Sequence, residues 1–146
     1  GGGTVNETNH AFRFGVRHYD ITQKPFIPLM GTVTEQSSIA NIGGGSTLGK
    51  AATLINFITA ANNTTDVGTT RMVINNSGNV GIGASSPGAK LDVDGGIKMA
   101  DDTATASSSN VGTQRYRTSG NNSYVDMCMQ TGASTYEWIN IVQNNW

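Results

Sequence analysis

The sequence predicts an all-β protein built from short strands, and three observations support this prediction. Gly, Ser, Thr and Asn make up 64 of the 146 residues, a composition typical of chains rich in turns. Apolar and polar residues alternate along several segments, which is the pattern of a strand with one buried face. Only 13% of the residues are charged, about half the usual share, and the net charge is −1.

The first part of the chain contains three candidate strands. Residues 11–19 alternate between apolar and polar side chains and predict the first. Residues 24–30 hold two of the three prolines, so we expect an extended segment there but not a central strand, because proline lacks the N–H group of a sheet ladder. After a glycine, residues 32–34 and 38–42 predict two short strands.

Residues 50–62 fit two kinds of element. Several of their apolar residues also match helical spacing. The central residues 53–59 are rich in β-branched and aromatic side chains, and residues 62–65 form a turn-like Asn-Asn-Thr-Thr sequence. We therefore favour a strand and keep the helix as the alternative.

Beyond Asp66 the pattern becomes a meander of strands of three to five residues separated by glycine-containing turns. The candidate strands are residues 71–74, 79–83, 90–94 and 97–99. Strands this short bury little apolar surface alone, whereas ordering the backbone costs roughly 1–2 kcal/mol per residue. We therefore expect partner chains to supply the missing burial.

Residues 101–110 contain no large apolar side chain and predict a linker or an exposed loop. Beyond them, residues 113–117, 123–130 and 135–142 predict a small antiparallel sheet. Alternation places Tyr124, Asp126 and Cys128 on one face of the second strand, and Tyr136, Trp138, Asn140 and Val142 on one face of the third. The domain prediction is residues 1–100, a connecting segment 101–110, and a C-terminal domain 111–146.

One glycine-rich segment resembles a nucleotide-binding loop. Residues 44–50 match the phosphate-binding pattern G-x-x-x-x-G-K. The residue that follows, which should be Ser or Thr to hold Mg²⁺, is Ala51, and the chain shows no series of βαβ units. We therefore interpret the segment as glycine-rich turns between strands and expect no cofactor.

The titratable residues give no catalytic or metal-binding set. His10 and His18 lack a carboxylate at a spacing that would orient either ring, and the single Cys128 sits in an apolar Met-Cys-Met run. Two carboxylate pairs could in principle cleave a glycoside: Asp92 with Asp94, and Asp101 with Asp102. The first pair is typical of a solvated strand face and the second of a turn, so we assign no catalytic residue.

Charge and hydropathy narrow the possible partners. The chain has a pI near 6.1 and lacks the basic character of nucleic-acid-binding domains, so we expect no nucleic-acid partner. No apolar run approaches the roughly 20 residues that span a bilayer, so we expect no membrane insertion. Aromatic residues gather in the C-terminal third, where a flat ring can stack on a sugar or anchor an interface. The candidate receptor contacts are Tyr124, Tyr136, Trp138 and Trp146, although burial in a small core is the commoner role for such rings.

Residues 71–95 read RMVINNSGNVGIGASSPGAKLDVDG. This string resembles the RMRI-x-x-x-GNVGIGT-x-x-P-x-x-KL-x-V-x-G stretch of bacteriophage tail fibres and related virion appendages. Residues 55–62 and 68–72 resemble pieces that precede that stretch in such fibres. Residues 112–117 and 119–146 resemble the short terminal domain of fibre-like proteins from marine phages. The resemblance covers about two thirds of the chain and departs from the common pattern at position 84, where Ala stands in place of the usual Thr.

The resemblance implies an intertwined, homotrimeric β-rich fibre shaft over residues 1–100, continuing from a longer parent chain, and a compact C-terminal domain. It also implies a virion appendage that contacts a host cell-surface glycan or protein. We thus expect a structural and adhesive protein that is not an enzyme. Two alternatives stay open: a bacterial extracellular filament or surface adhesin subunit, and a fragment of a polysaccharide depolymerase spike.

Overall fold

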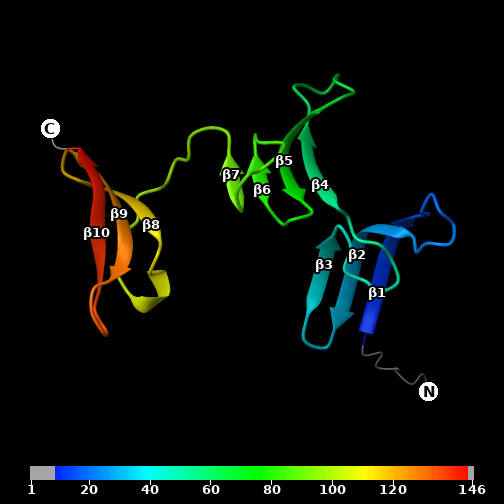
Figure 1. The fold of residues 1–146 in the computed structure, drawn as a ribbon, viewed down its shortest axis with the longest axis horizontal. Coiled ribbons are helices and arrows are strands. Elements are labelled where there is room, and N and C mark those ends of the chain that lie inside the picture. The colour runs from blue at the N-terminus through cyan, green and yellow to red at the C-terminus, as the bar shows by residue number, and fades with distance from the viewer. Residues whose placement is uncertain (1–8, 145–146) are drawn as a thin grey trace, which may run out of the picture. The chain divides into compact units, whose positions relative to one another are not determined.

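The computed structural model describes residues 9–144, and within them the protein is all-β, as composition and alternation predict (Figure 1). Ten strands form three sheets, and the single 3₁₀ turn η1 (Ser108–Asn110) is the one helical element among the described residues. Contacts divide the chain into two units, residues 1–95 and residues 96–146. The first unit contains two of the sheets and the second unit contains the third.

The first sheet has the antiparallel order β1–β2–β3, with β1 (Asn9–Val16), β2 (Phe26–Thr34) and β3 (Ser38–Ile42). The prediction that residues 24–30 avoid a central strand was wrong, because β2 is central and runs unbroken to Thr34. The sheet tolerates Pro28 because it has no register partner in β1, where a bulge follows Phe14. Its carbonyl accepts a hydrogen bond from the Gly43 N–H at 2.7 Å.

The second sheet has the order β4–β5–β6–β7, formed by β4 (Leu54–Thr59), β5 (Thr69–Asn75), β6 (Val80–Ile82) and β7 (Leu91–Val93). The favoured strand within residues 50–62 is therefore confirmed. The simple meander is not, because β6 and β7 pair in parallel. Residues 97–99 form no strand, since the ladder ends at β7 and two glycines, the first with a φ of +143°, follow shortly after.

Side-chain hydrogen bonds fix the turns between β5 and β7. The Asn75 Oδ1 atom accepts the N–H groups of Ser77 and Asn79, each at 3.0 Å. The Asn79 amide then donates to the Pro87 carbonyl at 3.2 Å, and the Lys90 ammonium donates to the Ser77 carbonyl at 2.7 Å. Short polar contacts therefore organise this segment without a large core.

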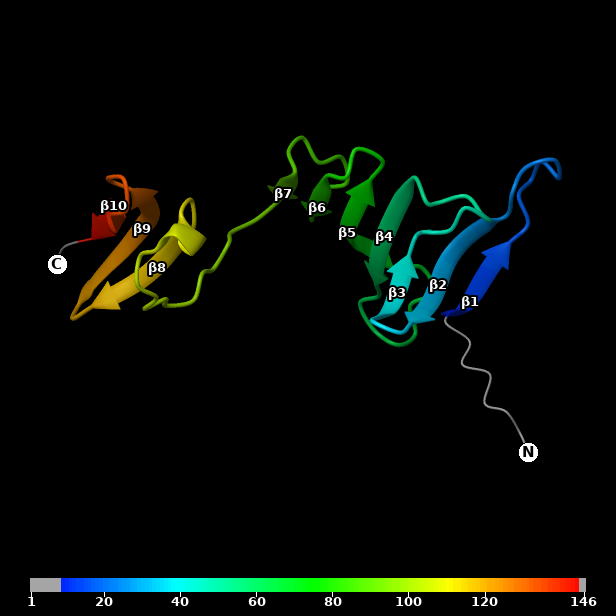
Figure 2. The same cartoon turned by 90° about the horizontal axis from the view of Figure 1, so that it is seen from below.

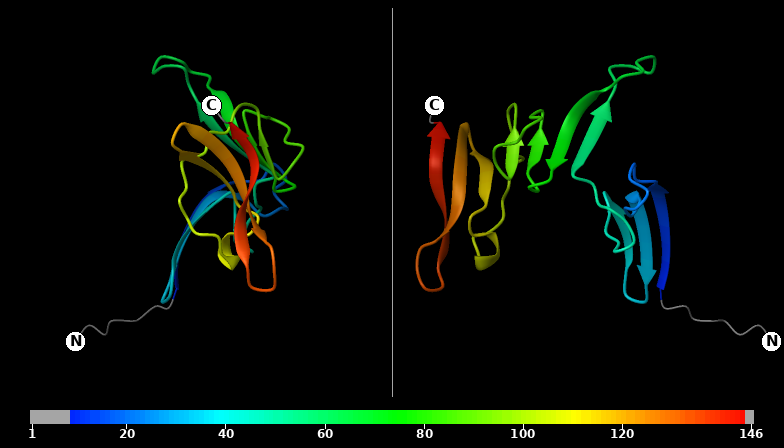
Figure 3. Two further views of the ribbon diagram at one scale, coloured as in Figure 1. Left: turned by 90° about the vertical axis from the view of Figure 1, so that its left-hand side faces the viewer. Right: turned by 45° about the vertical axis from the view of Figure 1, so that its right-hand side comes forward.

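The third sheet has the antiparallel order β10–β9–β8, as predicted, with β8 (Gln114–Ser119), β9 (Asn122–Gln130) and β10 (Tyr136–Asn144). Figure 3 shows the long β9–β10 hairpin, whose two strands pair in antiparallel register. A bulge between Asn140 and Val142 places Val142 opposite Val125. The predicted face of Val142 was therefore wrong, because the extra residue moves it to the face away from Asn140.

The segment expected to be a linker or an exposed loop is a loop fixed to the third sheet (Figure 2). Asp101 forms a parallel bridge with Tyr116 at the β8 edge, and the Asp102 N–H donates to the Tyr116 carbonyl at 3.0 Å. At the other end of the loop, the Cys128 N–H donates to the Thr113 carbonyl at 3.0 Å. Residues 101–113 therefore belong to the C-terminal unit.

Few side chains of the described residues are buried in the single chain. The buried apolar residues are Ile27, Met30, Val73 and Cys128, and the buried charged residue is Asp126. Most other apolar side chains lie on sheet faces that no part of residues 9–144 covers completely. These faces, and the surroundings of Asp126, are the features with functional potential.

Candidate functional site

The β4–β7 sheet has one face formed mainly by apolar side chains. The strand register places two adjacent apolar rungs on it: Ile55, Ile74, Val80 and Leu91 in one, and Phe57, Met72, Ile82 and Val93 in the next, with the intervening rung on the opposite face. Phe57, Ile82 and Leu91 are 43%, 45% and 57% exposed. We call this set the shaft face.

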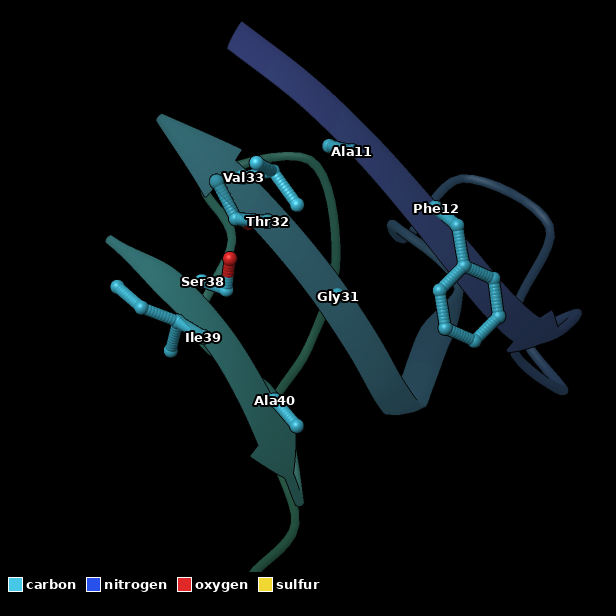
Figure 4. Close-up of a pocket in the computed structure, with 8 residues that line it drawn as sticks. All are labelled: Ala11, Phe12, Gly31, Thr32, Val33, Ser38, Ile39 and Ala40. Atoms are coloured by element: carbon cyan, nitrogen blue, oxygen red, sulfur yellow. The ribbon is translucent and has the colours of Figure 1, made fainter. Parts of the chain in front are cut away.

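The β1–β3 sheet also exposes apolar side chains on one face, namely Phe12, Phe14, Leu29, Val33 and Ile42, which are 39–65% exposed. Figure 4 shows residues of all three strands around a shallow pocket of about 480 Å³, with the Phe12 ring beside Gly31. A β-carbon at Gly31 would lie 2.9 Å from the Phe12 Cδ1 atom. The glycine therefore leaves room for the neighbouring ring.

The third sheet has an apolar face as well. Val125 and Met127 of β9 are half-buried there, while Ile139 and Val142 of β10 are 42% and 60% exposed. Beside them, residues 97–99 line, with Tyr116 and Val125, a hollow of about 420 Å³. Each of the three sheets thus presents an uncovered apolar face.

The opposite face of the third sheet is charged and closely packed. Asp126 in β9 is 0% exposed, and its Oδ2 atom accepts hydrogen bonds from Arg115 Nε at 3.1 Å and Arg117 Nε at 2.6 Å. Its Oδ1 atom accepts one from the Asn140 amide at 3.1 Å. The three partners come from β8 and β10, so this buried carboxylate links all three strands of the sheet.

The charge state of Asp126 follows from these contacts. Burial alone raises the pKa of this carboxyl, because it disfavours the charged form. The hydrogen bonds from Arg117, Asn140 and Arg115, together with the positive charge of Arg117, outweigh burial and hold the pKa below its ordinary value of 3.8. Asp126 is therefore ionised at neutral pH.

Two aromatic rings extend the cluster. The Arg115 guanidinium carbon lies 4.0 Å from the centre of the Trp138 ring, and that of Arg117 lies 3.8 Å from the centre of the Tyr124 ring. The Trp138 Nε1–H and the Arg115 Nη1 both donate to the Ala104 carbonyl, at 2.8 and 3.1 Å. The cluster therefore ties the 101–110 loop to the sheet.

The cysteine closes the same loop at its other end. The buried Cys128 thiol donates to Asn110 Oδ1 at 3.1 Å, and the Asn110 amide donates to the Thr105 carbonyl at 2.9 Å. This arrangement assigns Cys128 a structural role among buried hydrogen-bonded groups. Sequence reasoning found Asp126 only as a strand residue and missed its two arginines. The available signal was the spacing of Arg115 and Arg117, which places both on one strand face.

The predicted receptor contacts lie in different surroundings. Tyr124 and Trp138 are half-buried and stacked against arginines, so part of each ring is occupied within the chain. Tyr136 is half-buried at the start of β10, opposite Gln130. Trp146 lies outside the described residues. The structure thus brings Tyr124 and Trp138 to one sheet face, each beside an arginine.

Three of the four carboxylates in the two predicted pairs have structural partners. Asp92 Oδ2 accepts the Gly88 N–H at 2.9 Å. Asp101 accepts the hydroxyl of Thr118 at 2.9 Å, and Asp102 Oδ1 accepts the Ala104 N–H at 2.8 Å. These contacts stabilise turns and the loop that crosses the β8 edge, a use of carboxylates that requires no substrate.

The glycine-rich loop 44–50 is part of the framework of the first unit. The Lys50 N–H donates to the Pro25 carbonyl at 2.7 Å, and the Lys50 carbonyl accepts the Ile27 N–H at 3.2 Å. The element that follows is the strand β4. The loop therefore lacks the helix N-terminus on which a phosphate-binding loop depends.

Other classes of site are not found in the part of the chain that the structure describes. Residues 9–144 contain no group of three or more His, Cys, Asp or Glu side chains able to hold a metal ion. No helix among them has the length and apolar character needed to cross a membrane. In comparisons with known proteins, no family model and no curated protein matches this chain.

Proposed function

We propose that this chain is a structural and adhesive component of a phage tail fibre or similar virion appendage. In this proposal three copies pack their apolar sheet faces against one another, and exposed loops contact the host cell surface. The observation that carries it is the shaft face, where eight neighbouring apolar side chains from four strands have no complete cover within residues 9–144.

Energetics support self-association over an isolated chain. A fully buried aliphatic or aromatic side chain contributes about 1.5–3 kcal/mol relative to an exposed one, so each half-exposed side chain gains roughly half of that when a partner covers it. The shaft face carries no charged side chain that would oppose such packing. A second copy of the same chain is a suitable partner because it presents the same apolar surface.

The number of copies and the virion setting rest on the resemblance of residues 71–95 to tail-fibre shafts. That string forms β5, β6 and β7 together with the turns that Asn75, Asn79 and Lys90 fix. These strands supply six of the eight side chains of the shaft face. The segment that carries the resemblance is therefore also the segment that supplies most of the shaft face.

The test is the solution mass by light scattering, with negative-stain images of the same samples. We expect wild-type particles of about three chains, and a collapse to lower mass in Ile82→Asp, because a buried unpaired charge is strongly unfavourable. Asn56→Asp is the matched control, since Asn56 is an exposed residue of the same sheet on the opposite face. It should leave the mass unchanged.

Each other outcome contradicts part of the proposal. A wild-type monomer would overturn self-association through the apolar faces. Long open polymers would favour the bacterial filament or adhesin instead of a closed trimer. Release of sugar fragments from a bacterial capsule by the purified protein would favour the depolymerase spike.

A further inference from the structure

The charged face of the third sheet is closed at one end and open at the other. At the closed end the 101–110 loop covers Arg115, whose side chain is 10% exposed and whose Nη1 donates to the carbonyls of Asp102 and Ala104. At the other end lies Arg117, in register with Tyr124, and its side chain is 31% exposed. The two arginines therefore differ in what remains available for a ligand.

The Arg117 guanidinium is held in place from two directions. Its Nε donates to Asp126 Oδ2 at 2.6 Å, and its central carbon lies 3.8 Å from the centre of the Tyr124 ring. Within residues 9–144 its Nη groups have no hydrogen-bond acceptor. The contact through Nε leaves the edge formed by the two Nη groups unoccupied within residues 9–144. This edge can bind a carboxylate through two parallel hydrogen bonds.

The charge balance of the cluster is also incomplete. Two guanidinium groups share the single carboxylate of Asp126, so the cluster carries one net positive charge. No other carboxylate of the described residues lies within ion-pair distance of Arg117. Because the side chain is already ordered, a ligand need not supply the ordering cost of a flexible arginine.

We propose that Arg117, positioned by Asp126 and Tyr124, binds a carboxylate group of an acidic polysaccharide. The two Nη groups donate to the two carboxylate oxygens, and the net positive charge of the cluster attracts the anionic chain. This inference rests on the proposed function as a host-contacting appendage, and it names the chemical class of the surface ligand.

The experiment is calorimetric titration of the full chain with an oligogalacturonate, a carboxylated oligosaccharide, at low ionic strength. Arg117→Gln should weaken binding by about tenfold or more, the loss expected for a charge-assisted bidentate contact. Arg117→Lys should also weaken it, because lysine keeps the charge but lacks the planar fork. A neutral dextran oligosaccharide of equal length should not bind.

Arg71 provides the matched control. It is an exposed arginine whose Nε also donates to a side-chain oxygen, the Thr59 hydroxyl at 3.1 Å, but no aromatic ring covers it in the described structure. Arg71→Gln should change the affinity by less than about twofold if binding needs the Arg117 site rather than cationic charge in general. Equal weakening in Arg71→Gln and Arg117→Gln, or no binding by the wild type, would overturn the inference.

The same samples separate this inference from the proposed function. If tryptophan fluorescence shows that Arg117→Gln does not fold, the affinity of Arg117→Lys is compared with that of the wild type instead, because this variant retains a cation beside Asp126. A protein of trimeric mass that fails to bind the oligogalacturonate overturns the Arg117 site and leaves the assembly standing. A monomer that binds it through Arg117 supports the site and contradicts the trimer.

Discussion

The β4–β7 sheet and the β8–β10 sheet stabilise their strands in different ways. In the β4–β7 sheet, hydrogen bonds that the Asn75 side chain accepts and that the Asn79 and Lys90 side chains donate fix the turns, and the register places no ion pair between strands. In the second, the buried Asp126 joins three strands through Arg115, Arg117 and Asn140. The β4–β7 sheet depends on local turn chemistry, and the β8–β10 sheet depends on one central charge.

Both sheets nevertheless leave an apolar face open. The 101–110 loop covers the Arg115 end of the charged face of the third sheet, so the apolar face is the one available for packing against partner chains. This difference predicts that the two units respond separately to substitutions. Loss of the Asp126 charge should lower the stability of the C-terminal unit only. Backbone substitutions near the turns between β5 and β7 should lower the stability of the first unit only.

The largest expected effect is that of Asp126→Asn. Removing the carboxylate leaves Arg115 and Arg117 without their shared anion, and breaking a buried ion pair in this way costs about 3–5 kcal/mol. Denaturant unfolding followed by tryptophan fluorescence measures the loss, because both tryptophans lie in the second unit.

Asp92→Asn is the control for that substitution. Asp92 accepts one hydrogen bond from the Gly88 N–H and has no ion pair among the described residues. It belongs to the first unit, so the tryptophan transition should not move. A similar shift of that transition in both variants would contradict the separation of the two units.

A smaller effect is expected from acid. Because the folded-state pKa of Asp126 lies below its ordinary value of 3.8, the carboxylate contributes stability that is fully present above that value. The contribution is lost as the pH falls through the lowered pKa, when the folded state must take up a proton. Tryptophan-monitored stability should therefore decline below about pH 4. In Asp126→Asn this part of the pH dependence should be absent, and an unchanged slope would show that other carboxylates cause it.

The strand positions could be predicted well from the sequence because alternation and turn residues are local signals. They located the C-terminal sheet and resolved the 50–62 segment as a strand. They failed where a structural detail depends on pairing. Pro28 fits a central strand only because a bulge interrupts its ladder, and the parallel β6–β7 pair depends on hydrogen bonds from Asn79 and Lys90 across the turns.

The charged cluster could be predicted only in part. The sequence places Asp126 on the same strand face as Tyr124 and Cys128, a position that the register confirms. It does not reveal that Arg115 pairs opposite Asp126, because strand register is set by the whole sheet and its turns. The 101–110 loop contains no large apolar residue, and it contacts Arg115 and Trp138 through a backbone carbonyl. Because every residue type has such a carbonyl, the composition of the loop gives no sign of these contacts.

The smallest expected effect is that of a substitution at a glycine in the first unit. Gly83 has a φ of +76°, and its N–H donates to the Arg71 carbonyl at 2.9 Å. A β-carbon there would lie 3.1 Å from the Asp94 carbonyl oxygen. Gly83→Ala should therefore cost about 1–2 kcal/mol, the penalty of a left-handed conformation for a residue with a side chain.

Amide hydrogen exchange across residues 72–93 measures that cost without a tryptophan in the first unit. Gly96→Ala is the control, since a β-carbon there meets no atom within 4 Å. Faster exchange in Gly83→Ala with an unchanged tryptophan transition would show that turn geometry stabilises the first unit independently of the Asp126 cluster. If Gly83→Ala instead lowered the tryptophan transition, the two units would unfold as one, and the contrast between local turns and a central charge would fail.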